Sequence, residues 1–86
     1  MIKIYPTSRF KKSYKKLSLT IKKKTEKREK VFISNPFHAS LKTHKLKGRL
    51  KNFWAYSVDE NYRILFRFIS KHKVIYFDIG THKIYE

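Results

Sequence analysis

"FWAYSVDENYRILFRFISKHKVIYFDI", residues 53–79, is the stretch that decides the fold. It contains three apolar runs, at 53–58, 62–69 and 73–79, separated by the polar turns 59–61 and 70–72. Runs of this length, rich in aromatic and β-branched residues and bounded by polar turns, are typical of strands. Short turns join neighbouring strands in antiparallel order. The stretch therefore predicts an antiparallel meander.

The middle strand of this meander has two unlike faces, because alternate side chains point to opposite sides of a sheet. The first face suits packing against helices and carries Tyr62, Ile64, Phe66 and Phe68. The second carries Arg63, Leu65 and Arg67. Two arginines on one face leave that face open to something other than a core. The alternative is a solvated face on which arginine stems cover apolar surface.

The residues before this stretch predict one strand and two helices. Residues 2–5 alternate and precede a proline, as in a short edge strand. A helix capped at residue 7 or 8 follows, with apolar side chains at i, i+4 and i+7. The second helix runs from Thr20 to the Asn35–Pro36 pair, because the residue before proline resists helical backbone angles. Residues 36–52 have no period and predict an irregular connection.

The order of these elements, β-α-α-β-β-β, predicts a fold class. We expect a small α+β domain that spans residues 1–86, with two helices packed on one face of an antiparallel sheet. Neither a repeat nor a long linker divides the chain.

Charge is the strongest signal for function. The chain has 22 Lys and Arg against six Asp and Glu, a formal net charge of +16. A small chain with this charge repels itself unless a polyanion lies nearby. A nucleic acid is the first candidate, an acidic protein the second and an anionic membrane the third. A basic surface that is merely solvated is the remaining alternative.

The sequence gives no support for a metal site, a glycine-rich phosphate loop, an export signal or a membrane span. Cysteine is absent, no export signal is visible, and no run approaches the roughly 20 apolar residues of a membrane span. We therefore expect a cytoplasmic protein without membrane contact. The four histidines lack i, i+4 spacing, and no glycine-rich phosphate loop is present. We expect neither a metal nor a small-molecule cofactor.

Three motifs, taken together, resemble the toxins of the RelE/ParE superfamily, especially the RelE and YafQ branches. They are "LKGRLKNFWAYSV" at 46–58, "NYRILF" at 61–66 and "DIGTH", with a tyrosine three residues after the histidine, at 78–85. The resemblance implies a RelE-like fold and the toxin of a type II toxin–antitoxin pair. Members of these two branches cut mRNA in the ribosomal A site. The implied partners are the ribosome, mRNA and a cognate acidic antitoxin.

The resemblance also implies roles at individual positions. Arg63 falls where RelE-type toxins contact the scissile phosphate, and His82 matches a catalytic histidine of YafQ-type toxins. Tyr85 matches a C-terminal tyrosine of RelE-type toxins, and His44 an active-site histidine of the YafQ branch. Other positions depart from the pattern: Ser57 stands where the YafQ branch has histidine, and Asn61 where it has aspartate. The resemblance therefore does not assign which residue is the general base and which the general acid.

The same residue types suit RNA cleavage on chemical grounds. RNA carries its own nucleophile, the 2′-hydroxyl, so cutting needs a base, an acid and cations to hold the charge that builds on the phosphate. Histidine can take either proton role, and the arginine fork matches two phosphate oxygens. The residues expected to bind RNA phosphates are Lys42, Lys45, Lys47, Arg49, Lys51, Arg67 and Lys83.

Each assignment has a structural alternative. His82 is an ordinary surface histidine in that case, Tyr85 closes a sheet edge, and Arg63 pairs with Asp78 or Glu60. Trp54 and Tyr56 either stack on bases or belong to the core. Two other functions also fit: a ParE-like gyrase inhibitor without nuclease activity, and a plain RNA- or DNA-binding module.

Overall fold

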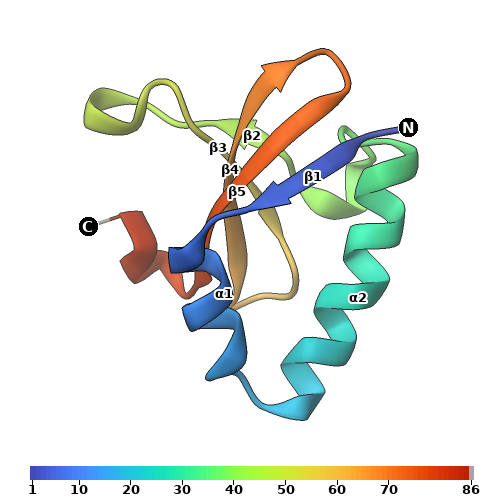
Figure 1. Cartoon of the computed structure of the whole chain (residues 1–86), viewed down its shortest axis with the longest axis vertical. Helices are drawn as coiled ribbons and strands as arrows, with labels where there is room; N and C mark the ends of the chain where they lie inside the picture. The colour runs from blue at the N-terminus through green and yellow to red at the C-terminus, as the bar shows by residue number, and fades with distance from the viewer. Residues whose placement is uncertain (86) are drawn as a thin grey trace.

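Five strands form one sheet in the order β1-β5-β4-β3-β2 (Figure 1). The computed structural model that contains them describes residues 1–85. The strands are β1 (Lys3–Pro6), β2 (His44–Lys45), β3 (Trp54–Ser57), β4 (Arg63–Ser70) and β5 (Lys73–Gly80). The helices are α1 (Ser8–Lys15) and α2 (Leu19–Ser34), with short 3₁₀ turns η1 (Ala39–Leu41), η2 (Gly48–Leu50) and η3 (His82–Tyr85).

The predicted α+β class is confirmed, and β3, β4 and β5 form the expected antiparallel meander. β1 lies at a sheet edge, as its proline indicated. Two details differ from the expected antiparallel sheet. β1 runs parallel to β5, because the chain returns to it through both helices and the meander, a crossover long enough for parallel pairing. The segment expected to be irregular contributes the two-residue strand β2.

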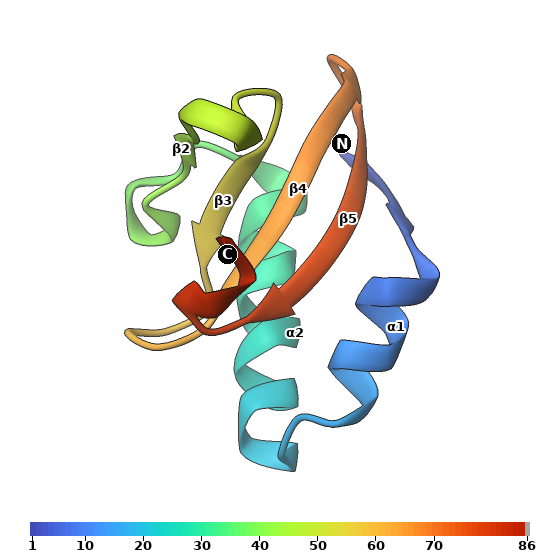
Figure 2. The same cartoon turned by 90° about the vertical axis from the view of Figure 1, so that its left-hand side faces the viewer.

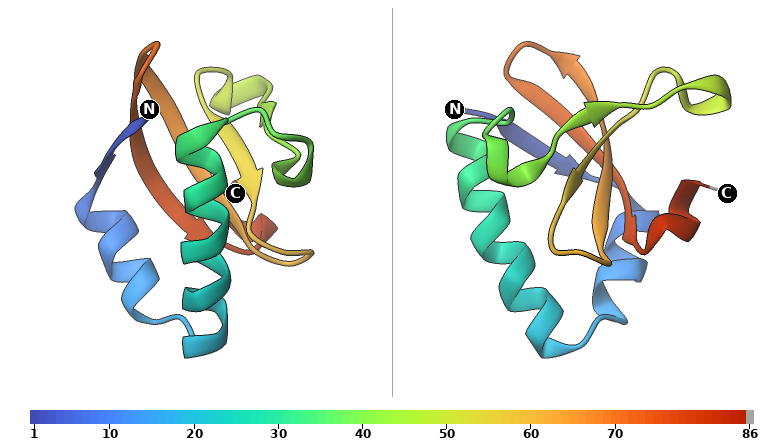
Figure 3. Two further views of the ribbon diagram at one scale, coloured as in Figure 1. Left: turned by 90° about the vertical axis from the view of Figure 1, so that its right-hand side faces the viewer. Right: turned by 180° about the vertical axis from the view of Figure 1, so that it is seen from behind.

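α2 packs on one face of the sheet, and α1 packs beside β5 (Figures 2 and 3). Phe32 of α2 is fully buried there, with its ring 4.5 Å from that of Tyr56 and 4.9 Å from that of Phe66. Phe10 of α1 reaches the same core through Tyr76, at 4.9 Å between ring centres. Within residues 1–85, neither helix is long and apolar enough to cross a membrane.

Side chains at the N-termini of both helices explain where the helices begin. The Thr7 hydroxyl accepts a hydrogen bond from the Phe10 backbone N–H, and the Ser18 hydroxyl accepts one from that of Ile21. These bonds satisfy N–H groups that a helix start leaves unpaired. Thr7 also lies against the carbonyls of β5, so the start of α1 is tied to the sheet.

Asp78 of β5 also holds α1 against the sheet, through side chains of α1 itself. Its buried carboxylate accepts hydrogen bonds from Arg9 Nε at 3.0 Å, from Ser13 Oγ at 2.6 Å and from the Ile79 N–H at 2.8 Å. A buried carboxylate is costly unless such partners surround it. Asp78 is therefore a structural anchor between α1 and β5.

Candidate active site

The sheet face opposite α2, here called the open face, carries two of the predicted arginines. Directly paired residues point to the same side of a sheet. Through the pairs His44–Ala55, Ala55–Leu65 and Ser57–Arg63, this rule places His44 with Arg63 on one face. Arg67 joins them by alternation along β4. In Figure 2 the open face is turned toward the viewer and α2 lies behind it.

The C-terminal turn η3 folds over one end of the open face. A Cβ atom at Gly80 would lie only 2.7 Å from Cγ2 of Ile84, so the turn can lie this close only because residue 80 is glycine. The Ile84 backbone N–H donates to the Thr81 carbonyl at 3.0 Å and closes the turn. The sequence motif "GTH" therefore serves to bring η3 back onto the sheet.

η3 brings Tyr85 close to Arg63. The Tyr85 hydroxyl is buried and has no hydrogen-bond partner among residues 1–85. Burial raises the pKa of Tyr85 above its ordinary value, and the charge of Arg63 opposes part of that rise. Tyr85 therefore stays a neutral phenol at neutral pH, with a hydrogen to donate.

Two cavities share Arg63 as a wall. The larger, about 610 Å³, lies between η3 and the β3–β4 turn and is also lined by His82 and Lys83. The smaller, about 300 Å³, is also lined by Lys42 and Ser57. Four of the predicted site residues therefore lie around Arg63: Lys42, His82, Lys83 and Tyr85. His82 is exposed at the wall of the larger cavity.

Arg63 is half-buried and pairs with no carboxylate of residues 1–85. The two ion pairs in this part of the chain are Arg9–Asp78 and Lys24–Asp59. Burial alone would raise the pKa of Asp59, but hydrogen bonds from the backbone N–H groups of Tyr62 and Asn61, and from Lys24, lower it. The salt bridge from Arg63 to Asp78 or Glu60, considered as an alternative above, is absent here.

His44 lies across the open face from Arg63. Two strand spacings and two residues along the strand separate their Cα atoms, a distance of about 12 Å. The His44 ring is exposed, and its Nδ1 lies 3.0 Å from the backbone carbonyl oxygen of Lys42. The two side chains extend from the same face of the sheet.

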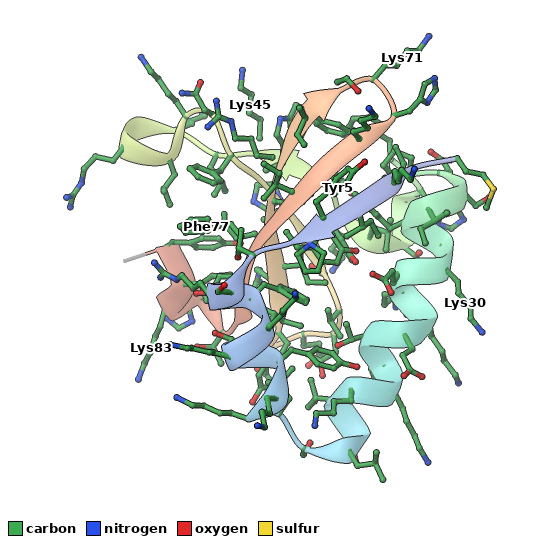
Figure 4. The ribbon with its side chains drawn as sticks, viewed as in Figure 1. Tyr5, Lys30, Lys45, Lys71, Phe77 and Lys83 are labelled. Atoms are coloured by element: carbon green, nitrogen blue, oxygen red, sulfur yellow. The ribbon has the colours of Figure 1, made fainter. Side chains whose placement is uncertain are left out.

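Five other basic residues lie farther from Arg63. Arg67 is four residues along β4, about 13 Å away, and exposed. Around η2, at the other end of the open face, lie the exposed residues Lys47, Arg49 and Lys51 (Figure 2). Lys45 pairs with Trp54 and so belongs to the opposite face. Figure 4 draws Lys45 far from Lys83, which projects from η3.

The strand aromatics Trp54 and Tyr56 are packing residues. Tyr56 is fully buried, and its hydroxyl lies 2.6 Å from that of Tyr76. Burial raises the pKa of both tyrosines. The Trp54 ring packs edge-on against Phe37 and Phe68, at 5.6 and 5.5 Å between ring centres. Of the two interpretations given above, core packing describes both residues.

Sequence reasoning missed two features of this region. Arg28 of α2 is half-buried and lines the smaller cavity with Arg63 and Lys42. It lies in a helix crowded with lysines, and nothing in the sequence sets it apart. Lys42 has a positive φ of 52°, which no sequence pattern announced. Within residues 1–85, no three His, Asp or Glu side chains are grouped so as to hold a metal ion.

No family model and no curated protein matches the sequence. Solved structures do match the fold. YafQ from E. coli superposes with a TM-score of 0.74 at 20% identity, over 99% of this chain and 98% of that one. A YoeB/ParE toxin from Agrobacterium tumefaciens gives 0.77 at 18%, over 94% and 99%. The chain has the RelE-like toxin fold.

A third match shows this fold in an assembly. The RelBE2 toxin–antitoxin complex from Mycobacterium tuberculosis contains a chain that superposes with a TM-score of 0.76 at 16% identity, over 93% of this chain and 96% of that one. At these identities the likeness concerns the RelE-like fold alone. The function of this chain must therefore be inferred from the residues around Arg63.

Proposed function

We propose that this protein is the toxin of a type II toxin–antitoxin pair and acts as a ribosome-dependent mRNA endonuclease. The observation that carries the proposal is the position of Arg63. It has no carboxylate partner within residues 1–85, it borders two cavities, and Tyr85 and His82 lie on the turn beside it. A cation so placed suits a phosphate group better than a structural ion pair.

The proposed reaction needs no group beyond those of the chain and the RNA. A base takes the proton of a 2′-hydroxyl, and the 2′-oxygen attacks the adjacent phosphorus. A bond from O2′ to phosphorus forms, the bond from phosphorus to O5′ breaks, and an acid gives a proton to O5′. The products are a 2′,3′-cyclic phosphate and a free 5′-hydroxyl.

The geometry suggests how the residues divide this work. Arg63 holds the phosphate and balances the charge that builds on it. Tyr85, a neutral phenol with an unpartnered hydroxyl, donates a hydrogen bond to a phosphate oxygen or a proton to O5′. His82 lies at the wall of the larger cavity, where it can donate a proton to the leaving O5′. Lys42 and Lys83 line the approaches and attract the RNA backbone.

The proposal includes a cognate acidic antitoxin as partner. A net charge of +16 favours binding of an acidic chain, which would cover the basic surface and block the open face. The RelE-like chain of the RelBE2 complex is found with an antitoxin, which supports this expectation. Co-expression with the neighbouring gene product, followed by affinity purification, should recover an acidic partner. Recovery of the basic chain alone would count against it.

Primer extension on a defined mRNA, with and without translating ribosomes, tests the proposed activity. We expect cuts that appear only with ribosomes and in register with codons. Arg63→Ala and His82→Ala should each lower the cutting rate about 100-fold or more, because each removes a group that acts in the transition state. His72→Ala is the matched control, since this exposed histidine lies on the β4–β5 turn, outside both cavities.

Other outcomes distinguish the alternatives. Cuts without ribosomes would indicate a free ribonuclease. Cutting that survives both single substitutions would refute the site but not the activity. If neither lane shows cuts, inhibition of gyrase supercoiling is the next assay, and a positive result there would favour the ParE-like alternative.

A further inference from the structure

The backbone of Lys42 has an unusual conformation for its residue type. Its φ of 52° lies in the left-handed region, and within residues 1–85 it is the single non-glycine residue with positive φ. Lysine has no preference for this region, which glycine, asparagine and aspartate adopt more readily. Backbone outliers of this kind persist where the surroundings impose them, and they concentrate at functional sites.

The surroundings of Lys42 impose this conformation from both sides. On the N-terminal side, Leu41 is fully buried, and the Lys42 N–H donates to the Ala39 carbonyl at 3.3 Å. On the C-terminal side, the Thr43 hydroxyl donates to the Pro36 carbonyl. The turn between η1 and β2 is therefore fixed at three points, although Lys42 itself is exposed.

The fixed turn directs the Lys42 carbonyl at His44. The oxygen lies 3.0 Å from Nδ1 of the imidazole. A carbonyl oxygen only accepts hydrogen bonds, so Nδ1 must carry the hydrogen, and in the neutral ring Nε2 then has a free lone pair. The ring is exposed on the open face, so Nε2 is accessible to a substrate.

We propose that Lys42, through its backbone carbonyl, is a positioning residue that holds His44 as the general base. The inference rests on the proposed function. Nε2 of His44 accepts the proton of the 2′-hydroxyl as O2′ bonds to phosphorus, while the bond to O5′ breaks and O5′ receives a proton from the η3 side. The carbonyl fixes both the tautomer and the orientation of the ring.

The tautomer is measured first, in the free protein. Two-bond ¹⁵N–¹H correlation spectra of ¹⁵N-labelled protein distinguish Nδ1–H from Nε2–H for each neutral histidine, and His44→Gln assigns the His44 signals. We expect the Nδ1–H form for His44. A predominant Nε2–H form, or fast exchange between the two, would overturn the positioning role whatever the protein does to RNA.

Two variants then separate the backbone from the side chain of Lys42. Lys42→Asn and Lys42→Thr both remove the ammonium group, but asparagine tolerates the left-handed region and β-branched threonine resists it. We expect Lys42→Thr to lose the Nδ1–H preference and to cut about tenfold more slowly than Lys42→Asn, because a misplaced group loses much of its effect. Their affinities for the ribosome should agree, since the charge lost is the same.

The outcomes keep the two proposals apart. Equal cutting rates and equal tautomers in the folded variants would overturn the positioning role alone. Wild-type protein that has the Nδ1–H form yet cuts no RNA on ribosomes would overturn the proposed function, and with it the role of His44 as base.

Discussion

Gly80 shows how one missing side chain shapes the candidate site. Any Cβ at this position would press on Ile84, and the β-branched isoleucine has little freedom to move aside. The turn η3 would then shift away from the sheet, and Tyr85 and His82 with it. The contact distance at Gly80 thus explains why glycine stands at the start of the "GTH" motif, without reference to any other protein.

We predict that Gly80→Ala lowers the cutting rate much more than it lowers stability. The free energy of unfolding should fall by about 1–3 kcal/mol, as for other overpacked sites. Gly48→Ala is the matched control. Gly48 has a φ of 69°, and a Cβ there meets nothing within 4 Å, so alanine adds backbone strain away from the cavities. Urea unfolding and cutting rates of both variants check this, and equal rates would contradict the role of η3.

At the scale of elements, the β3–β4 turn is held by one of its two carboxylates. Asp59 accepts hydrogen bonds from the N–H groups of Asn61 and Tyr62, both at 2.8 Å, and pairs with Lys24 of α2 at 3.2 Å. Glu60, the next residue, is exposed and makes no hydrogen bond or ion pair within residues 1–85. This turn leads directly into Arg63, so its geometry sets the start of β4.

We predict that Asp59→Ala costs about 1–2 kcal/mol of stability at pH 7, because it leaves turn N–H groups without their acceptor. The folded pKa of Asp59 lies below the ordinary value of 3.8, so its contribution is present above pH 3.8 and is lost as the pH falls below it. The gap in unfolding free energy between wild type and variant should therefore close below that pH. Glu60→Ala should change little at any pH.

The elements also show what the sequence made predictable. The meander was predictable because its apolar runs are long and its turns polar, and the end of α2 because the Asn35–Pro36 pair marks it. The strand β2 was not, since two residues, His44 and Lys45, are too short to show a period. The parallel β1–β5 pair joins the two ends of the chain, and local patterns carry no information about such pairs.

The candidate site was predictable in part, for similar reasons. Arg63 and η3 lie in or beside the meander, where register follows from alternation. The φ of Lys42 depends on anchors at Pro36, Ala39 and Leu41, which no spacing reveals. The part played by Asp78, which holds Arg9 and Ser13 of α1, likewise required the tertiary structure.

At the scale of the whole molecule, like charges dominate. The six acidic residues cannot balance 22 basic ones, and residues 1–85 contain only two ion pairs. Lysines such as Lys30, Lys71 and Lys83 project away from the ribbon on different sides (Figure 4). Repulsion among them opposes the compact state, and dissolved ions screen it over a Debye length of about 8 Å at physiological salt.

We predict that stability and RNA binding respond to salt in opposite directions. Between 20 and 200 mM NaCl the melting temperature should rise by several degrees, since screening relieves repulsion, while the affinity for RNA should fall about tenfold or more. Differential scanning fluorimetry and filter binding provide the two measurements. A melting temperature that falls with salt would show that net repulsion is not what limits stability.

The pairing of β1 with β5 has a consequence for the order of events during synthesis. Lys3 is hydrogen-bonded to the carbonyl of His72, and the Thr7 hydroxyl to that of Phe77, 70 positions later. The first strand therefore has no partner until the last one has been made. A nascent chain that still lacks β5 also lacks Asp78, Tyr76 and η3, so it has neither a closed core nor an assembled cavity. If the proposed function is right, the nascent polypeptide cannot cut mRNA on the ribosome that makes it until β5 and η3 have been made.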